Sequence, residues 1–158
     1  MTVNGVTTYL WFDTEALEAA EFYVGLFPNS RLGTVSHYGP NAQMPEGTVL
    51  VAEFELFGRP FAGLNGGPLF PHSEAVSFQV LCDTQEELDH LWYSLIADGG
   101  EESMCGWCRD RWGVSWQIVP TVLGELARSG GPGSAKAFEA MMQMRKLDIA
   151  ALRQAAAQ

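Results

Sequence analysis

Apolar and polar side chains alternate in several short stretches of this chain, and each such stretch predicts a β-strand. In TTYLWFD, residues 7–13, Leu10 and Phe12 alternate with Tyr9 and Trp11. β-Branched and aromatic residues that alternate in this way are typical of a strand buried on one face. Further strands are expected over residues 31–38, 48–57 and 60–65.

The segment that follows the first strand has the spacing of a helix. Residues 15–27, EALEAAEFYVGLF, follow the candidate caps Asp13 and Thr14 and end at Pro28. Asp and Thr side chains cap helix N-termini, and proline cannot continue a helix. The stretch therefore predicts one helix between the first and second strands.

The same order of elements begins again in the second half of the chain. EAVSFQVLC, residues 74–82, predicts a strand, and DTQEELDHLWYSLIADGG, residues 83–100, predicts a capped helix with an apolar stripe. Strands near 101–109 and 114–119 follow, so the chain reads as an α+β protein of two β-α-β-β-β units. The expected organisation is a first unit over 1–68, a second over 69–121 and a C-terminal helical extension over 122–158, in one compact domain.

The pattern after Pro120 is helical. Residues 121–129 predict a helix, and a Gly/Pro linker is expected at 130–134. The last segment is rich in Ala, Met and Leu, and Asp148 is expected to act as an internal cap that divides it into two helices. These helices are expected to pack on the body of the protein or on a partner chain.

Acidic residues outnumber basic ones, with 19 Asp and Glu against 9 Lys and Arg, which gives a net charge of -10. Such a charge opposes binding to phosphate backbones and to anionic membranes, so neither a nucleic-acid nor a membrane partner is expected. The N-terminal sequence lacks the charged start and long apolar run of a signal peptide. A cytoplasmic protein with free thiols is therefore expected.

The stretch MCGWCRDRWGVSWQIVP, residues 104–120, contains Cys105 and Cys108 at the spacing of a redox or metal motif. A redox motif of this kind needs a helix that starts at the first cysteine. Here the turn-forming residues 110–113 and a β-rich segment follow instead, so both residues are predicted to be ordinary strand cysteines on opposite faces. Gln117 then stands in the middle of the closing strand, where a ligand-facing polar residue is expected.

Four segments, FAGLNGGP, SFQVLCDTQEELD, GWCRDRWGVSWQIVP and MMQMRKLDIAAL, follow one another along the chain. Together with the two β-α-β-β-β units, they resemble the PhnB-like branch of the vicinal oxygen chelate superfamily of glyoxalases, dioxygenases and bleomycin-resistance proteins. This branch is labelled 3-demethylubiquinone-9 3-methyltransferase-like. The resemblance covers nearly the whole chain, and it implies a glyoxalase-like fold in which paired units curl a sheet into a cup, commonly within a homodimer.

Active members of this superfamily hold a divalent metal through the first and last strands of each unit, usually by His or Glu. By the resemblance, these positions fall near Thr7, near Ala62, near Ser77 and on Gln117. A hydroxyl, a methyl group and an amide are poor donors for a divalent cation, which prefers carboxylates or imidazoles. No metal cofactor is therefore predicted at these positions, and a metal held by other ligands stays open.

The face of the sheet opposite the helices is expected to line the cup. Alternation along the strands selects the ligand-binding candidates Thr7, Tyr9, Trp11, Ser77, Gln79 and Gln117, and Trp107 and Asn65 are further candidates near the rim of the cup. Aromatic walls with hydroxyls and amides suit a small, moderately apolar molecule, and the alternative is that these aromatics fill a closed core. Glu53 and Glu55 share one face of a strand, and they are candidate catalytic bases if that face is the cup rather than the solvent side.

Three functions fit these observations. The first is a metal-poor binding protein for a small molecule, and the second is an enzyme of the glyoxalase or dioxygenase type, either metal-dependent or using Glu53 or Glu55 as a base. The third is an assembly subunit whose C-terminal helices form an interface. Methyl transfer is disfavoured, because the turn after the first strand lacks the glycines that bind S-adenosylmethionine in the common methyltransferase fold.

Overall fold

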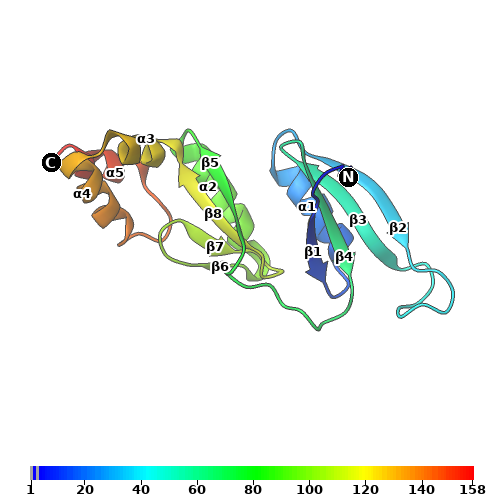
Figure 1. Ribbon diagram of the computed structural model, residues 1–158. Helices are drawn as coiled ribbons and strands as arrows, with labels where there is room; N and C mark the ends of the chain where they lie inside the picture. The colour runs from blue at the N-terminus through cyan, green and yellow to red at the C-terminus, as the bar shows by residue number, and fades with distance from the viewer. Residues whose placement is uncertain (1, 3) are drawn as a thin grey trace. The chain divides into compact units, whose positions relative to one another are not determined.

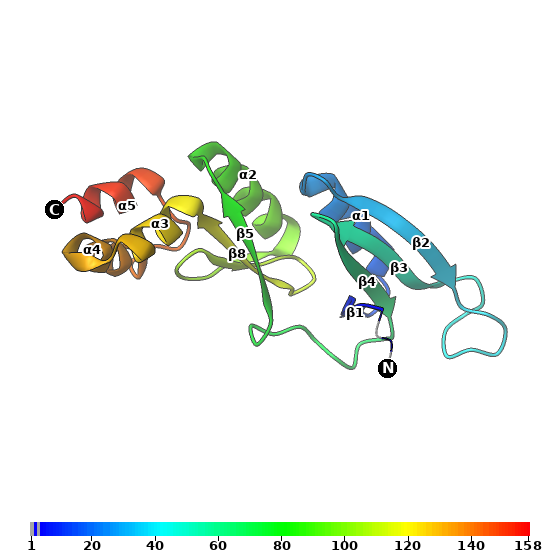
Figure 2. The same ribbon diagram turned by 45° about the horizontal axis from the view of Figure 1, so that its top comes forward.

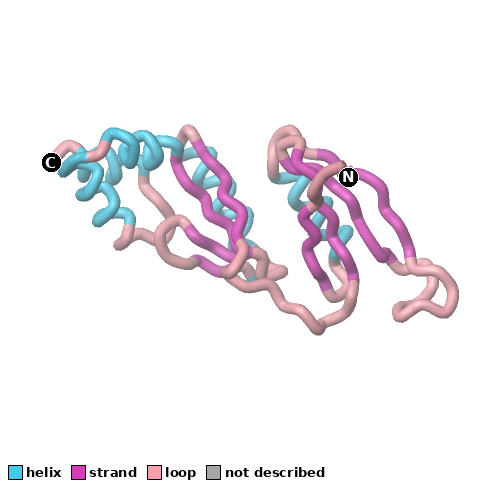
Figure 3. The backbone as a smooth tube through the Cα atoms, viewed as in Figure 1, coloured by secondary structure: helices cyan, strands magenta, loops and turns pink. Residues whose placement is uncertain are grey.

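The computed structural model describes residue 2 and residues 4–158, and it forms two compact units, Met1–Pro71 and His72–Gln158 (Figure 1). Each unit contains a four-stranded sheet and a helix that covers one face of that sheet (Figures 2 and 3). The expected α+β class with two β-α-β-β-β units is therefore confirmed.

The first unit has one parallel and two antiparallel strand pairs. Its strand order is β1-β4-β3-β2, in which β1 and β4 run parallel and the other pairs are antiparallel. Helix α1 packs on one face of β3 and β4, and leaves the other face open. The elements are β1 (Thr8–Phe12), α1 (Ala16–Leu26), β2 (Arg31–His37), β3 (Val49–Leu56) and β4 (Arg59–Asn65).

The second unit repeats this topology, with strand order β5-β8-β7-β6 and a parallel pair between β5 and β8. The Thr84 hydroxyl and the Glu87 carboxylate form the capping box expected at the start of α2. The elements are β5 (Ser77–Cys82), α2 (Gln85–Ile96), the short helix η1 (Ala97–Gly99), β6 (Glu101–Glu102), β7 (Trp107–Arg109) and β8 (Ser115–Pro120).

Three helices follow the second sheet, namely α3 (Thr121–Ser129), α4 (Gly131–Met141) and α5 (Ile149–Ala156). Asp148 caps α5 as expected, since its carboxylate accepts the backbone N–H of Ala151 at 2.9 Å. The expected linker at 130–134 is instead the first turn of α4, because proline is well tolerated at the start of a helix. None of the described helices has the length and apolar character needed to span a bilayer.

The strand expected over residues 101–109 is interrupted. Residues 103–106 form a turn, with positive φ at Cys105 (59°) and Gly106 (84°). The backbone N–H groups of these two residues donate to the carbonyls of Met144 and Arg145, each at 2.7 Å. The C-terminal segment therefore takes the hydrogen bonds that would have continued the strand, and Cys105 lies in a turn.

Candidate functional site

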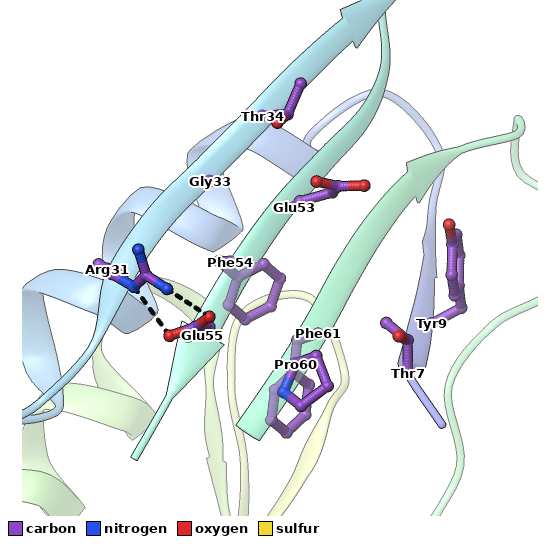
Figure 4. A pocket seen from close by; sticks show the side chains of 10 residues that line it. All are labelled: Thr7, Tyr9, Arg31, Gly33, Thr34, Glu53, Phe54, Glu55, Pro60 and Phe61. Carbon is purple, nitrogen blue, oxygen red and sulfur yellow. Dashed lines mark hydrogen bonds and ion pairs between the residues drawn. The ribbon is translucent and has the colours of Figure 1, made fainter. Parts of the chain in front are cut away.

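Strand β3 presents two carboxylates on the open face of the first sheet. Ala52, Phe54 and Leu56 are buried on the side that α1 covers. Side chains alternate along a strand, so Glu53 and Glu55 lie on the opposite side. Both residues line a hollow on that side of the sheet (Figure 4).

The strand register shows which residues neighbour Glu53 on this face. Tyr9 is the cross-strand partner of Ala62 on β4, and Ala62 is the partner of Glu53 on β3. Tyr9, Ala62 and Glu53 therefore form one row across three strands, on the same face of the sheet. Tyr9 and Glu53 line the hollow, whereas Ala62 between them is fully buried and is not a lining residue.

A β-bulge in β2 lies directly opposite Glu53. Leu32 pairs with Phe54 and Val35 pairs with Ala52, so Gly33 and Thr34 together face the single residue Glu53. A bulge bends the strand and re-aims the side chains around it. Gly33 also lacks a side chain, and a Cβ there would lie 3.1 Å from the Glu53 carbonyl oxygen.

The hollow has a volume of about 350 Å³ and is open to solvent on one side. Phe54 and Phe61 border the hollow from β3 and β4, but their stacked rings, with centroids 5.4 Å apart, are buried on the face that α1 covers. This volume lies in the range of small-molecule sites. The lining residues are Thr7, Tyr9, Arg31, Gly33, Thr34, Glu53, Phe54, Glu55, Pro60 and Phe61 (Figure 4).

The two carboxylates of the hollow differ in their partners. Glu55 accepts two hydrogen bonds from Arg31, one from Nε at 2.8 Å and one from Nη2 at 2.6 Å. These hydrogen bonds hold the pKa of Glu55 below its usual value and raise that of Arg31. Among the described residues, Glu53 has neither an ion pair nor a side-chain hydrogen bond. The hollow therefore contains one compensated carboxylate and one uncompensated carboxylate.

The open face of the second sheet carries a row of neutral polar groups. Gln79 and Gln117 are partners across β5 and β8, and Trp107 on β7 is the next partner of Gln117. The Gln117 amide donates to the Ser77 hydroxyl at 2.8 Å, and its oxygen accepts a longer hydrogen bond from Gln79 at 3.4 Å. The structure thus brings together the four ligand-binding candidates of the second unit.

Asn65 has its polar atoms engaged within the first unit. Its side chain is 3% exposed, and Oδ1 accepts the backbone N–H of Ala16 at 2.8 Å while Nδ2 donates to the Val49 carbonyl at 3.1 Å. Asn65 is paired with Phe12, whose side chain faces the helix. This residue therefore fixes the start of α1 and lies away from the open face.

Trp11 lies on the open face but leans away from the hollow. Its indole N–H donates to the carbonyl of Gly67 at 2.7 Å, and its ring meets Phe70 edge-on at 4.9 Å. Gly66 packs closely beneath it, because a Cβ at that position would lie 2.2 Å from the indole ring. Thr7 and Tyr9 are thus the members of the predicted first-strand set that line the hollow.

Sequence reasoning missed Arg31, Gly33, Thr34 and Pro60 as lining residues. Arg31 belongs to the site only because the register of β2 and β3 places it opposite Glu55. The bulge that follows changes which face each β2 residue occupies, and the sequence carries no local signal of it. The available clue was that Arg31 and Glu55, two residues of opposite charge, lie at the ends of two predicted strands.

The residues at the positions of the superfamily metal ligands do not fit a divalent cation. Ala62 and Gln117 offer a methyl group and an amide, and their partners on the parallel strands, Tyr9 and Gln79, supply no carboxylate or imidazole either. Over residue 2 and residues 4–158, no group of three or more His, Cys, Asp or Glu side chains is placed to hold an ion. The donor set at these positions therefore gives no basis for a reaction step through a metal.

The three cysteines are free thiols, as expected. Burial is the main cause that raises the pKa of Cys82 to about 11 and that of Cys108 to about 12. Cys108 lies in β7, whereas Cys105 lies in the preceding turn, with its Sγ 3.6 Å from the Met142 sulfur. The turn at 110–113 is confirmed, since the Asp110 carboxylate accepts the backbone N–H groups of Trp112 and Val114.

Comparisons with known proteins place this chain in a family. The sequence model of the 3-demethylubiquinone-9 3-methyltransferase family matches residues 4–119. The PhnB protein from Bacillus cereus is 34% identical, with a TM-score of 0.67, and the match covers 74% of this chain and 99% of that chain. No curated protein matches the chain.

Two more distant structures share the fold alone. A protein from Pseudomonas aeruginosa is 20% identical, with a TM-score of 0.57 over 74% of this chain and 96% of its own. The fosfomycin resistance protein FosX from Listeria monocytogenes, complexed with Mn(II) and sulfate, is 13% identical, with a TM-score of 0.52 over 82% of this chain and 100% of its own. This chain belongs to the 3-demethylubiquinone-9 3-methyltransferase family, the PhnB-like branch of the vicinal oxygen chelate superfamily.

Proposed function

We propose that this protein binds a small organic molecule in the hollow on the open face of the first sheet. The observation that carries the proposal is the row Tyr9–Ala62–Glu53, in which an exposed ring and a carboxylate without a partner among the described residues flank a small residue. Concave sites with apolar walls and few convergent polar groups are the usual form of ligand pockets. Thr7 and Thr34 add hydroxyls at the margins of the same hollow.

The proposed site does not use a metal. Fold similarity to FosX is not a reason to infer that this chain also binds Mn(II), because metal binding depends on the residues of the site. The corresponding positions here offer a methyl group and an amide, and their partners Tyr9 and Gln79 offer a phenol and a second amide. These groups support capture of an organic ligand better than they support coordination of a divalent ion.

Catalysis by Glu53 is the second candidate function. A general base needs a carboxylate within reach of the bound substrate, and Glu53 lines the hollow without a hydrogen-bond partner among the described residues. Glu55 is less suited, because Arg31 already occupies both of its oxygens. Methyl transfer, the activity in the family's description, has weaker support, since neither described sheet is the doubly wound parallel sheet of common methyltransferases.

The test of binding uses a substitution that blocks the hollow from its exposed edge. Thr34→Trp would place an indole at the bulge, and Thr14→Trp makes the same change at an exposed position in the turn before α1. Ligand-observed NMR with a panel of small aromatic compounds of positive, zero and negative charge is then compared among the three proteins. We expect compounds that bind the wild type and Thr14→Trp but lose binding in Thr34→Trp. If every bound compound is insensitive to Thr34→Trp, the hollow is not the site.

We also propose a cytoplasmic homodimer, with support from the family rather than from the single chain. Light scattering on the full chain is expected to give twice the 17.3 kDa mass of one chain. A mass of one chain at micromolar concentration would contradict this part of the proposal.

A further inference from the structure

We propose that the ligand of the hollow is a small organic cation, such as a protonated aromatic amine, whose ammonium group pairs with Glu53. This inference rests on the proposed binding function and adds the charge class of the ligand. Three features of the first unit support it, namely the charge balance of the hollow, the distance between Glu53 and Tyr9, and the bulge opposite Glu53.

The charge balance favours a cation. The hollow is lined by Arg31, Glu53 and Glu55, and the positive charge of Arg31 is held by Glu55 through two hydrogen bonds. Among the described residues nothing compensates the Glu53 carboxylate, and the lining groups other than these three are neutral. The whole chain carries a net charge of -10, so the longer-range field also attracts cations.

An anionic ligand would meet two obstacles in the same hollow. It would have to displace Glu55 from Arg31, which already engages both oxygens of that carboxylate. It would also approach the like charge of Glu53, and placing like charges together is unfavourable at the distances within one pocket. The guanidinium is therefore a poor anchor for a ligand carboxylate or phosphate.

The second feature is the spacing of the row. Glu53 and Tyr9 are separated by the single strand that carries Ala62, so their Cα atoms are about 10 Å apart across two strand spacings. The Tyr9 side chain is 58% exposed, which leaves its ring available to a ligand. A ring joined to an ammonium group by a short chain can place its apolar part beside Tyr9 and Pro60 and its charge at Glu53. Aromatic rings also attract cations directly.

The third feature is that the carboxylate stands on a locally rigid element. Glu53 lies in the middle of β3, between paired strands on both sides, and Gly33 and Thr34 of the bulge face it from β2. Phe54 next to it is packed on Tyr23 of α1, with ring centroids 6.0 Å apart. Binding groups held by sheet and core need less ordering when the ligand arrives, and this favours affinity.

The experiment compares three probes that differ mainly in charge, namely 2-phenylethylamine, 2-phenylethanol and phenylacetate. Isothermal titration is carried out at neutral pH and low salt with the wild type, Glu53→Gln and Glu21→Gln. Glu21 is an exposed residue of α1, which packs on the other face of the sheet, so Glu21→Gln removes the same net charge away from the hollow. Glu53 is also exposed, so its substitution is expected to leave the fold intact, and circular dichroism checks this.

We expect the amine to bind the wild type and Glu21→Gln about tenfold more tightly than the alcohol, and phenylacetate to bind more weakly than either. In Glu53→Gln the preference for the amine should disappear, while the alcohol keeps its affinity. Equal affinity for amine and alcohol, tighter binding of phenylacetate, or an amine preference that survives Glu53→Gln would overturn the inference but leave the binding function standing. If none of the three probes binds, the cation inference is wrong, and the charge-varied panel with Thr34→Trp decides the binding function separately.

Discussion

Glu53 and Ala62 are cross-strand partners on the open face of the first sheet, so a carboxylate stands beside a methyl group. The opposite neighbour of Glu53 is the bulge at Gly33, which has no side chain. One long residue therefore lies between two small ones, of which Gly33 lines the hollow and Ala62 is buried next to it. Enlarging either of them should close the site more effectively than changing its polar groups.

Ala62→Val tests this dependence. Two added methyl groups should displace Glu53 and Tyr9, the cross-strand partners of Ala62, and lower the affinity for 2-phenylethylamine about fivefold, which corresponds to about 1 kcal/mol. Ala62 is fully buried, so overpacking should also cost about 1–3 kcal/mol of stability. Titration calorimetry and urea unfolding measure the two effects, and Ala42→Val in an exposed loop is the control. Unchanged affinity in a folded Ala62→Val protein would show that the amine binds elsewhere.

Arg31→Met is expected to strengthen the binding of the amine. Removal of the Arg31 guanidinium leaves the negative charge of Glu55 without its partner, so the hollow gains a second uncompensated carboxylate. The affinity for 2-phenylethylamine should rise about threefold at low salt, and less at high salt, because the site is open to screening. Arg59→Met is the matched control, since Arg59 is paired with Leu56, which faces the helix. A lower affinity in Arg31→Met would show that Arg31 attracts the ligand.

Asn65→Ala should destabilise the first unit without altering the open face directly. The substitution leaves the backbone N–H of Ala16 at the start of α1 without its acceptor, and it also removes the donor to the Val49 carbonyl. Loss of a cap of this kind costs about 1–2 kcal/mol of unfolding free energy. Urea unfolding compares it with Asn4→Ala, a change at an exposed residue before β1. Equal stability of the two variants would contradict the role assigned to Asn65.

Native alkylation is expected to separate the three cysteines. Cys82 and Cys108 are buried, with pKa values of about 11 and 12, so few of these thiols are ionised at pH 8. Iodoacetamide should therefore add once per chain, at Cys105, and labelling of the other two should increase only as the pH rises towards 11. Mass spectrometry of the wild type and Cys105→Ser measures this. Rapid labelling of Cys108 or a bond between Cys105 and Cys108 would revive a redox role.

The sequence predicted the topology well because each element has a local signal. Alternation along residues 7–13 and the capping sequence before α2 are short-range patterns, and the structure confirms both elements. The break at 103–106 could not be predicted locally, because it depends on backbone groups of residues 144 and 145 that are distant in sequence. A strand prediction uses only the residues of the strand itself.

The candidate site was predictable in part for the same reason. Alternation placed Glu53 and Glu55 on one face, but it could not tell which face the helix covers. Asn65 was predicted to bind ligand near the rim of the cup, whereas its amide reaches the start of α1 across 49 residues of sequence. The bulge opposite Glu53 changes the face of the β2 residues that directly follow it, and only the register reveals it.

A crystal structure of the full chain soaked with 2-phenylethylamine tests most directly whether the hollow binds an organic cation. We predict density in the hollow of the first unit, with the ammonium nitrogen about 3 Å from the Glu53 carboxylate and the ring beside Tyr9. The prediction would be contradicted if, at a saturating concentration of the amine, its density lies at another position and only water fills the space between Glu53 and Tyr9.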